Sequence, residues 1–445
     1  MTTLVIENAS VIDGMGAARQ AGQTVVIDGD RIVEVTPTAA ARDGATPTGA
    51  IRIDAAGKTV MPGLIDAHCH MTYGESLAQE EQDIYTSVEG RTLRAAWNIR
   101  KVLAAGVTGI SQPGGSHFIG VALRDGIRAG RVKGPRMSTA GRYITTSNGL
   151  ADFYPDSVGP VEGGIGIRCN TTDEMVTEVR RQVKNGVDFI KLADSIFGQY
   201  QSFRFEELQA IVDLAHQLHR PVTIHARGDA EMNAAVRAGC DWVMHGNVMS
   251  QETVDLLAET QTPLVPTLVL LHNWAEYGPL VGAPTPIVEG SKRMLARTRQ
   301  SLHLAHEAGV RFVVGTDSGF AVTPYGEWHA KELELLMDYA GLNELEAIQA
   351  ATWNAGRTLN LEGKVGAVAP GMLADLIVVD GDPSVDLTVL QERDRIETVI
   401  VGGQVMDVDR DIESWRNDGV QLFAREPITR DLVKARRADL EGGTE

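Results

Sequence analysis

The chain has 445 residues, of which 43% are hydrophobic and 22% are charged, a composition typical of a folded globular protein with a substantial core. Its 41 Lys and Arg residues stand against 59 Asp and Glu residues, and the formal net charge of −18 argues against nucleic acid or an anionic membrane surface as a partner. With barrel domains of roughly 200–250 residues common, two domains fit this length better than three.

The N-terminal sequence MTTLVIENASVIDG lacks the basic and long apolar regions of a signal peptide, and the chain has no run of about 18 uninterrupted apolar residues. The three cysteines, Cys69, Cys169 and Cys240, are too few and too scattered for a disulfide framework or a thiolate zinc site. These features predict a cytoplasmic protein with no membrane contact.

Both ends of the chain are rich in short β-branched runs bounded by turn residues. At the N-terminal end the predicted strands are Thr3–Ile6, Val11–Asp13, Thr24–Ile27, Ile32–Val35 and Ile51–Ile53. At the C-terminal end they are Val365–Val368, Asp375–Val379 and Thr398–Val401. We predict that residues 1–57 and 363–445 together build one small sheet domain.

Residues 58–362 alternate short apolar runs with longer stretches of helical period, which predicts βα units and a parallel sheet. Thr171 with Glu174, and Asn343 with Glu346, have the spacing of capping boxes at helix starts. The eight candidate strands are Val60–Ile65, Val107–Ser111, Arg136–Ala140, Val187–Leu192, Pro221–His225, Trp242–His245, Pro263–Val269 and Val310–Thr316. Eight parallel strands with outer helices predict an α/β fold of the (β/α)8 TIM-barrel type, whose chemistry lies at the C-terminal strand ends.

Side chains that can bind metal ions gather at the ends of these predicted strands. In extended chain, the His-x-His spacing after strand 1 directs both rings to the same side. The full set is His68 and His70 after strand 1, Lys191 in strand 4, His225 after strand 5, His245 after strand 6 and Asp317 after strand 8. In a barrel, all of these strand ends meet at one mouth.

Each of these residues, taken alone, also has a structural explanation. Lys191 is either a lysine that reaches the rim of its strand or a neutral amine that captures carbon dioxide as a carbamate, because a buried ammonium is costly. A lone histidine is often a satisfied core residue, and Asp317 fits an Asx turn or a helix cap. Six such coincidences would have to meet at one mouth, so the set favours a metal centre.

These motifs resemble those of the amidohydrolase superfamily over nearly the whole chain. They are Pro62–His70 (PGLIDAHCH), Lys191, His225, His245, Gly315-Thr316-Asp317 and Pro370–Leu376 (PGMLADL). Residues 121–125 (VALRD) and 332–336 (ELELL) look like the clade of binuclear prolidase-like and N-acyl amino acid hydrolases, which also resembles imidazolonepropionase. Relatives that cleave herbicide and mycotoxin amides, ureas or thiocarbamates look similar too. The resemblance implies a TIM barrel with a small β-sandwich domain formed by both termini.

The resemblance also implies a role for each residue of the set. His68 and His70 would hold a first metal with Asp317, His225 and His245 would hold a second, and Lys191 would bridge both as N6-carboxylysine. Two divalent ions, expected to be zinc with manganese or cobalt as alternatives, would activate a bridging hydroxide and polarise the scissile carbonyl. Asp317 would pass the proton of that hydroxide to the leaving nitrogen.

Substrate contacts are expected from long irregular segments after strand 3 (about residues 143–169) and strand 7 (about residues 272–289). Arg142, Tyr143, Arg227 and His329 are the candidates for holding a substrate carboxylate or carbonyl, with a structural role as the alternative for each. Many relatives carry a segment rich in glycine and histidine after strand 3, whereas residues 141–150 (GRYITTSNGL) contain no histidine. This departure concerns the substrate and leaves the metal ligands intact.

The predicted function is hydrolysis of an amide-like C–N bond in a dipeptide or an N-acyl amino acid. The alternatives are a hydrolase of a xenobiotic amide, phenylurea, carbamate or thiocarbamate, a mononuclear deaminase, and a non-enzymatic homologue. A deaminase would have a glutamate shortly after the strand 5 histidine and no bridging lysine, whereas Ala226-Arg227-Gly228 follow His225 and Lys191 is present. The complete ligand set disfavours a non-enzymatic homologue. We expect a small-molecule substrate and a homo-oligomer.

Overall fold

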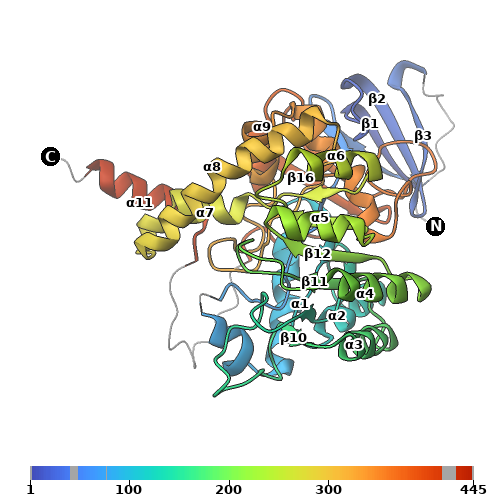
Figure 1. The fold of residues 1–445 in the computed structure, drawn as a ribbon. Helices are drawn as coiled ribbons and strands as arrows, with labels where there is room; N and C mark the ends of the chain where they lie inside the picture. Colours follow the sequence, from blue (N-terminus) through green and yellow to red (C-terminus); the bar gives the residue numbers. More distant parts are fainter. Residues whose placement is uncertain (1–2, 41–48, 77, 413–426, 443–445) are drawn as a thin grey trace.

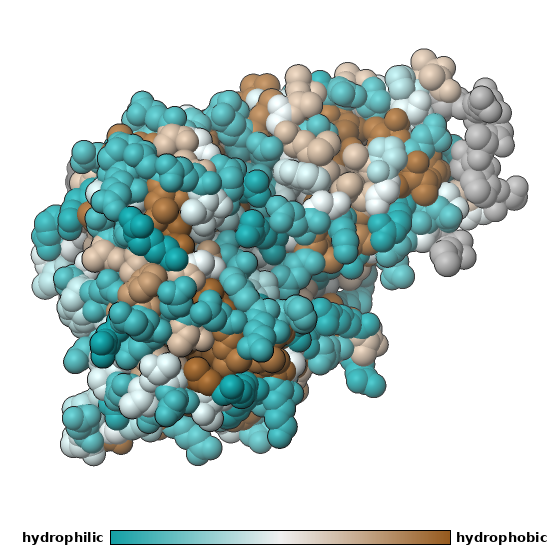
Figure 2. All heavy atoms as spheres, turned by 45° about the vertical axis from the view of Figure 1, so that its right-hand side comes forward, coloured by the Kyte–Doolittle hydropathy of each residue, from teal (hydrophilic) through white to brown (hydrophobic). Residues whose placement is uncertain are grey.

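The computed structural model of the chain describes residues 3–40, 49–76, 78–412 and 427–442. Figure 1 shows strands β1, β2 and β3 at the upper right of the molecule and helix α11 (Arg430–Gly442) on the opposite side, with the parallel strands and their helices between them. Hydrophilic side chains cover much of the face drawn in Figure 2, and hydrophobic side chains form separate patches on it.

An eight-stranded sheet unites strands from both ends of the chain. Its order is β17-β16-β15-β5-β1-β2-β3, and β4 pairs with β1. The bounds are β1 (Thr3–Val11), β2 (Gln20–Asp28), β3 (Arg31–Pro37), β4 (Ile51–Asp54), β5 (Thr59–Pro62), β15 (Leu376–Val379), β16 (Ile396–Val401) and β17 (Gln404–Val405). Val60 of β5 lies opposite Val378 of β15, and both belong to one buried apolar cluster of this sheet. The two β-rich ends therefore pair directly, while the limits of a domain stay a prediction.

Two parallel sheets carry the central part of the chain, in the orders β6-β7-β8 and β10-β9-β11-β12-β13-β14. The bounds are β6 (Leu64–Asp66), β7 (Val107–Gln112), β8 (Arg136–Thr139), β9 (Tyr143–Thr145), β10 (Gly166–Arg168), β11 (Ile190–Ala193), β12 (Val222–Ala226), β13 (Trp242–His245) and β14 (Leu264–Val265). Between β8 and the segment before β11, the Asp188 amide donates to the Thr139 carbonyl (2.8 Å). The chain thus has an α/β fold based on parallel strands.

Several of the predicted strands differ from the structure. Val60–Ile65 is divided at Gly63 into β5 and β6, and only Val11 of the predicted strand Val11–Asp13 belongs to a strand, β1. A Cβ atom at Gly63 would lie 2.1 Å from the side chain of Thr108, so this position requires glycine. Val310–Thr316 forms only an isolated bridge, between Phe312 and Leu264, and its remaining contacts with neighbouring strands are single hydrogen bonds. Val365–Val368 is irregular, since Gly366 takes a positive φ of 79°.

The predicted loop at residues 272–289 is largely helical, which corrects the sequence prediction. It contains the end of α7 (Val269–Glu276), all of η3 (Gly278–Val281) and the start of α8 (Thr285–Glu307). The predicted strand 263–269 is also shorter in the structure, where only β14 is formed. Pro279 and Pro286 lie in the first turns of η3 and α8, where the missing N–H of proline interrupts no helical hydrogen bond. The other predicted irregular segment, residues 143–169, begins and nearly ends with the short strands β9 and β10, which corrects the prediction there, while residues 146–165 between them contain no helix or strand.

Helices accompany the parallel strands along the chain, and Figure 1 shows α3, α4 and α5 beside β11 and β12. Their bounds are α1 (Val88–Ala104), α2 (Ile119–Arg128), α3 (Thr172–Lys184), α4 (Phe205–Gln217), α5 (Asp229–Arg237), α6 (Gln251–Thr260), α9 (Lys331–Ala340) and α10 (Glu344–Ala350). The predicted capping boxes at Thr171 and Asn343 are confirmed at the starts of α3 and α10. Within the described residues, every helix is too short or too polar to cross a membrane.

Candidate metal centre

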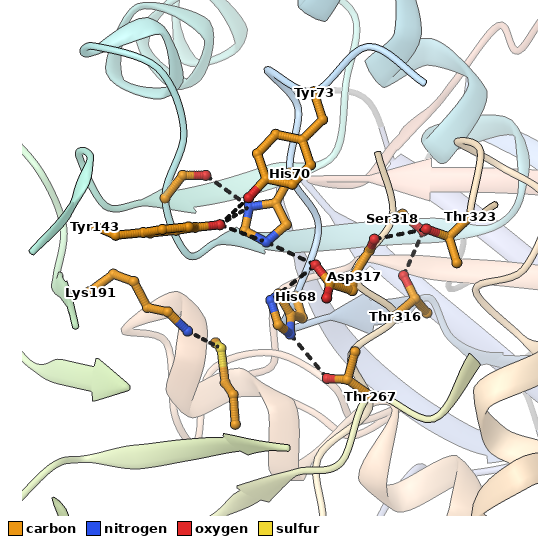
Figure 3. A network of polar contacts seen from close by, with 12 residues as sticks. His68, His70, Tyr73, Tyr143, Lys191, Thr267, Thr316, Asp317, Ser318 and Thr323 are labelled. Carbon is orange, nitrogen blue, oxygen red and sulfur yellow. Dashed lines mark hydrogen bonds and ion pairs between the residues drawn. The ribbon is translucent and has the colours of Figure 1, made fainter. Parts of the chain in front are cut away.

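Three of the predicted ligands meet directly. His68 and His70 follow β6, and Asp317 follows the extended segment 310–316. One ligand atom from each lies within 4.8 Å of the others, and all three residues are buried. As Figure 3 shows, His70 Nε2 is 3.1 Å and His68 Nε2 is 3.4 Å from the same carboxylate oxygen of Asp317. Two imidazoles and a carboxylate in this arrangement can hold a divalent ion.

The second nitrogen of each of these rings has an oxygen partner. His70 Nδ1 lies 2.9 Å from the carbonyl oxygen of Gly114, and His68 Nδ1 lies 3.0 Å from the hydroxyl of Thr267. When Nδ1 donates its hydrogen to such a partner, Nε2 is the free nitrogen that faces Asp317. The surroundings therefore select the ring orientation that metal binding requires.

Asp66 connects the two strand ends that carry these ligands. Its Oδ1 accepts the backbone N–H of His68 (2.9 Å) and that of Thr316 (3.1 Å), while Oδ2 accepts the Thr316 hydroxyl (2.5 Å). Nδ1 of His329 also lies 2.7 Å from Oδ2. Asp66 is 1% exposed, and these four contacts satisfy its buried carboxylate. They also join the chain segments that carry His68 and Asp317.

Three residues around the centre have the left-handed backbone conformation that non-glycine residues seldom adopt. The φ angles are 56° for Asp317, 77° for His245 and 58° for Thr267. Thr267 is β-branched, so this conformation is least favourable there. Strain of this kind persists where the surrounding structure fixes it, and it is concentrated at functional sites.

Lys191, His225 and His245 come from three adjacent parallel strands, β11, β12 and β13. The ring centroids of His225 and His245 are 4.4 Å apart, and His245 is 5.2 Å from His68, so this group adjoins the first three ligands. Burial lowers the pKa of His68, His225 and His245 well below the usual range. These rings are therefore neutral at pH 7, the form in which histidine binds metals.

Lys191 is 1% exposed, and its Nζ contacts the sulfur of Met244 at 2.7 Å. Burial lowers the pKa of the Lys191 amine to about 7, although the nearby charge of Asp317 raises it. A substantial share of the amine is consequently uncharged near neutral pH. An uncharged amine is the form that can react with carbon dioxide to give a carbamate.

The buried polar atoms of the site fit a metal centre. Neither ring nitrogen of His245 has a hydrogen-bond partner among the described residues, although His245 is fully buried. A buried polar group without a partner is costly, and a metal ion would satisfy it.

Two of the four predicted substrate contacts lie beside these ligands. The hydroxyl of Tyr143 is 3.2 Å from His70 Nε2. Arg227 is buried, its Nη1 donates to Asn247 Oδ1 (2.7 Å), and its Nε has no partner among the described residues. Burial lowers the pKa of the Arg227 guanidinium to about 10, with an opposing contribution from Asp317. It therefore remains a cation at the edge of the centre.

The other two predicted contacts are held within the protein. Arg142 donates from Nη1 to the carbonyl of Glu162 (3.0 Å), in the irregular segment after β9. His329 contacts Asp66 through Nδ1 and accepts the N–H of Gly326 at Nε2 (3.0 Å). Neither ring nitrogen of His329 is directed to a ligand, so the ring acts on the centre through Asp66.

Some residues around the centre were not anticipated from the sequence. Asp66 lies in the motif that ends in His70, and a carboxylate at a strand end was a signal that could have identified it. Glu332 accepts the N–H groups of Leu268 and Val269 at the start of α7, whereas in the sequence it was noted only as the first residue of the motif 332–336, with no role assigned to it. Thr267 had no sequence signal at all, because its contact with a ligand depends on the packing of distant strands.

Comparison with known proteins gives a consistent picture. The chain is 27% identical over 399 residues to ochratoxinase of Aspergillus niger, covering 82% of this chain and 78% of the relative. It is 25% identical over 382 residues to imidazolonepropionase of Rubrobacter xylanophilus, covering 80% and 84%. A crystal structure of a prolidase complexed with N-methylphosphonate-L-proline superposes with a TM-score of 0.82 and 29% identity, covering 92% of this chain and all of that one.

The profile that describes the amidohydrolase family matches residues 59–406. This range includes all six predicted metal ligands and the strands that position them. The chain is a hydrolase that belongs to the amidohydrolase family.

Proposed function

We propose that the chain is a binuclear metal-dependent hydrolase that cleaves the amide-like C–N bond of a dipeptide or an N-acyl amino acid. The observation that carries this proposal is the convergence of six ligand-type side chains, among which His245 has two buried ring nitrogens without partners. The similarity to a prolidase complexed with a proline-containing phosphonate supports a substrate with a carboxylate near the scissile bond.

In this proposal His68, His70 and Asp317 hold the first ion, and His225 and His245 hold the second. Lys191, as N6-carboxylysine, would be a ligand of both ions. Zinc suits these ligands best, and manganese or cobalt can replace it. When bound, the ions supply an attacking hydroxide at neutral pH and polarise the carbonyl group of the substrate.

Asp317 has the proposed role of proton carrier. Burial alone would raise the pKa of Asp317, but the neighbouring rings of His68 and His70 lower it more, so its pKa lies below the ordinary value. The carboxylate is thus ionised at neutral pH and can accept the proton of the attacking group. It then passes the proton to the leaving nitrogen, which departs as a neutral amine.

Arg227 is the proposed partner of the substrate carboxylate. It is buried and charged, and one of its nitrogens has no partner among the described residues. A guanidinium with free donors binds a carboxylate more strongly than a neutral donor does. Burial and the charge of Arg227 lower the pKa of His225, so the guanidinium lies close to a residue proposed to hold the second ion.

The proposal includes the architecture that brings the ligands together. We infer a closed (β/α)8 barrel in which segment 310–316 joins β14 to β6, supported by hydrogen bonds from Val313 to Leu264 and from Ala67 to Val314 (both 2.9 Å). The proposed domain limits are 58–362 for the barrel and 1–57 with 363–445 for a β-sandwich; residues 41–48 and 413–426 of the latter lie outside the described residues.

A second candidate is hydrolysis of a xenobiotic amide with an aromatic or aliphatic group, on the same centre. The observation in its favour is an apolar cluster of Tyr73, Tyr143, Ile165 and Ala193, against which Leu150, Ala151 and Phe320 pack. Leu150 lies in the segment where histidine was expected from the resemblance. The similarity to ochratoxinase agrees with this candidate.

The deaminase alternative is disfavoured by the surroundings of Glu231, the first glutamate after His225. Its Oε1 accepts the backbone N–H groups of Arg227 (3.1 Å) and Gly228 (2.8 Å) at the start of α5. Glu231 therefore caps a helix and is not free to carry protons to a bound base.

The test combines metal analysis with a substrate panel on protein purified without chelator. We expect two divalent ions per chain and hydrolysis of dipeptides or N-acyl amino acids, with slower hydrolysis of the matched substrates whose carboxylate is amidated. Aryl amides, aryl ureas and thiocarbamates in the same panel test the second candidate, and light scattering tests the expected homo-oligomer. One ion per chain with full activity would contradict the binuclear centre, and a two-ion protein inactive on the whole panel would contradict the proposed reaction.

A further inference from the structure

Two tyrosines lie at the edge of the metal centre, on the side of His70 (Figure 3). The side chains of Tyr73 and Tyr143 are 2% and 3% exposed, and their hydroxyl groups form a hydrogen bond with each other. The Tyr143 hydroxyl also lies 3.2 Å from Nε2 and 3.3 Å from Nδ1 of His70. No step of the proposed reaction has so far used this pair.

The two hydroxyl groups carry two hydrogens, and the hydrogen bond between them uses only one. The other hydrogen needs a different acceptor. Among the described residues, the other hydrogen-bonding contact of the pair is with the His70 ring. Because Nδ1 of His70 faces the Gly114 carbonyl, Nε2 is the ring nitrogen that can accept the Tyr143 hydrogen. An ion on Nε2 removes that acceptor, and a buried hydroxyl hydrogen without an acceptor is unfavourable.

The structure constrains the positions of both tyrosine rings closely. The Tyr143 ring lies against Gly114, where a Cβ atom would come within 2.0 Å of Tyr143 Cε1. The ring of Tyr73 stacks on His70, with centroids 4.3 Å apart and an interplanar angle of 11°. Nζ of Lys191 is 6.0 Å from the centroid of the Tyr143 ring. The Tyr143 side chain therefore borders both the first ligands and the bridging lysine.

We infer that Tyr143 is a catalytic residue whose hydroxyl donates a hydrogen bond to the carbonyl oxygen of the scissile bond, an inference that rests on the proposed hydrolysis. This hydrogen bond strengthens as the oxygen gains negative charge in the tetrahedral state, and no proton is transferred. Tyr73 is a positioning residue that donates its own hydrogen to the Tyr143 oxygen, which leaves the Tyr143 hydrogen for the substrate. Chains of such donors strengthen one another.

Residues 141–150 contain no histidine, and the inference gives this segment a hydrogen-bond donor of another kind, the phenol at position 143. A phenol donates over a wider pH range than imidazole, because its ordinary pKa is about 10. Its ring also adds apolar surface to the cluster that includes Ile165 and Phe320.

The first experiment compares Tyr143→Phe with the wild type and with Tyr339→Phe, a control on helix α9. The readouts are metal content, kcat, KM, and calorimetric binding of N-methylphosphonate-L-proline, whose tetrahedral phosphonate imitates the proposed transition state. We expect Tyr143→Phe to keep its metal and nearly the same KM, while kcat falls by about 10²–10³, the usual loss for one such donor. Binding of the phosphonate should weaken at least tenfold.

The second experiment is a double-mutant cycle with Tyr73→Phe, which keeps the ring that stacks on His70. If Tyr73 acts only through Tyr143, its variant loses less kcat than Tyr143→Phe, and the double variant is no slower than Tyr143→Phe alone. Multiplicative losses would overturn the positioning role of Tyr73.

The outcomes separate the failure of this inference from the failure of the proposed function. Suppose that the wild type hydrolyses a substrate of the panel and that the kcat of Tyr143→Phe is within threefold of the wild-type kcat. This result would overturn the role of Tyr143. So would a Tyr143→Phe variant that loses metal, because Tyr143 would then support the centre and not the substrate. A two-ion wild type that neither hydrolyses the panel nor binds the phosphonate overturns the proposed function instead, and this inference with it.

Discussion

The two halves of the candidate metal centre are held in different ways. In the first half, Nδ1 of each histidine has an oxygen partner, at 2.9 Å for His70 and 3.0 Å for His68. In the second half, neither nitrogen of His245 has a partner among the described residues, and Nζ of Lys191 contacts the Met244 sulfur. The first half is thus oriented by the protein, whereas the second half contains buried polar atoms that still need partners.

For the proposed binuclear centre, this difference predicts how each half contributes to the free energy of metal binding. Ligands that are already oriented bind an ion with little loss of conformational freedom. In the second half, burial favours the neutral forms of Lys191 and of both histidines, and His225 Nε2 lies 3.2 Å from the Ser195 carbonyl oxygen. Ion binding would supply the interactions that the ring nitrogens of His245 lack. We therefore expect metal affinity in the second half to depend on the ligands themselves and on the carbamate. In the first half, we expect metal affinity to depend also on the residues that orient the ligands.

The largest effect is expected from Lys191→Ala, which removes the group proposed to join the two halves. The variant should lose most of its metal, because the centre itself is lost. Its activity should fall by more than the factor of about 10²–10⁴ that general acid–base catalysis provides. Short carboxylic acids in the buffer should partly restore both, since the carbamate acts only as a ligand. Lys184→Ala, on the exposed side of α3, is the control. Wild-type turnover with both ions bound would make Lys191 a structural residue.

Asp317→Asn separates proton transfer from metal binding in the first half. The amide keeps the shape and one ligating oxygen, so the variant should retain much of its metal and bind substrate. Its kcat should fall by about 10²–10⁴-fold, because the proton acceptor is lost. In the wild type, the acid limb of the kcat/KM profile reports a coupled titration that includes Asp317, so that limb should change in the variant. A near-normal kcat would leave Asp317 as a replaceable ligand.

Thr267→Val tests the support behind the first half. It keeps the β-branched shape but removes the hydroxyl that lies 3.0 Å from His68 Nδ1. Loss of such a partner usually lowers metal affinity by about 10–100-fold, so the affinity of one of the two ions should fall by that factor. Competition with a chromophoric chelator measures this affinity. Met244→Leu is the matched change in the second half and should have a smaller effect, because a thioether orients Lys191 weakly. Equal losses would contradict the difference between the halves.

The smallest effect is expected from Glu332→Gln, at the residue that fixes the segment after Thr267. Burial raises the pKa of Glu332 to about 8, from an ordinary value near 4.5, although hydrogen bonds from Leu268 and Val269 lower it. A raised pKa gives stability that is complete below the ordinary pKa and is lost as the pH rises through about 8. The slope attributable to this group is at most about 1.4 kcal/mol per pH unit.

The measurement is the thermal unfolding midpoint between pH 5 and pH 8, with metal removed from both proteins. Since glutamine does not titrate, the wild type should lose stability relative to Glu332→Gln as the pH rises. Parallel curves for the two proteins would show that Glu332 does not titrate in this range.

Local patterns in the sequence were sufficient for several features of this protein. The alternation of apolar runs and helical periods predicted parallel strands, and the capping boxes at Thr171 and Asn343 appear where they were expected. The predicted ligands converge because they lie within or directly after neighbouring parallel strands, or after the extended segment 310–316, and the C-terminal ends of parallel strands lie on the same side of a sheet. Segment 272–289 was misread because an amphipathic helix that starts with proline resembles a loop when its packing partner is unknown.

Other features depend on contacts between distant parts of the chain. Asp66 and His329 are 263 residues apart, and Thr267 is 199 residues from His68, so no local pattern can indicate that they touch. The sequence by itself determined which residue types stand at the strand ends. Only the tertiary structure decided which side chains orient them, because that depends on packing in three dimensions and on which buried polar atoms find partners.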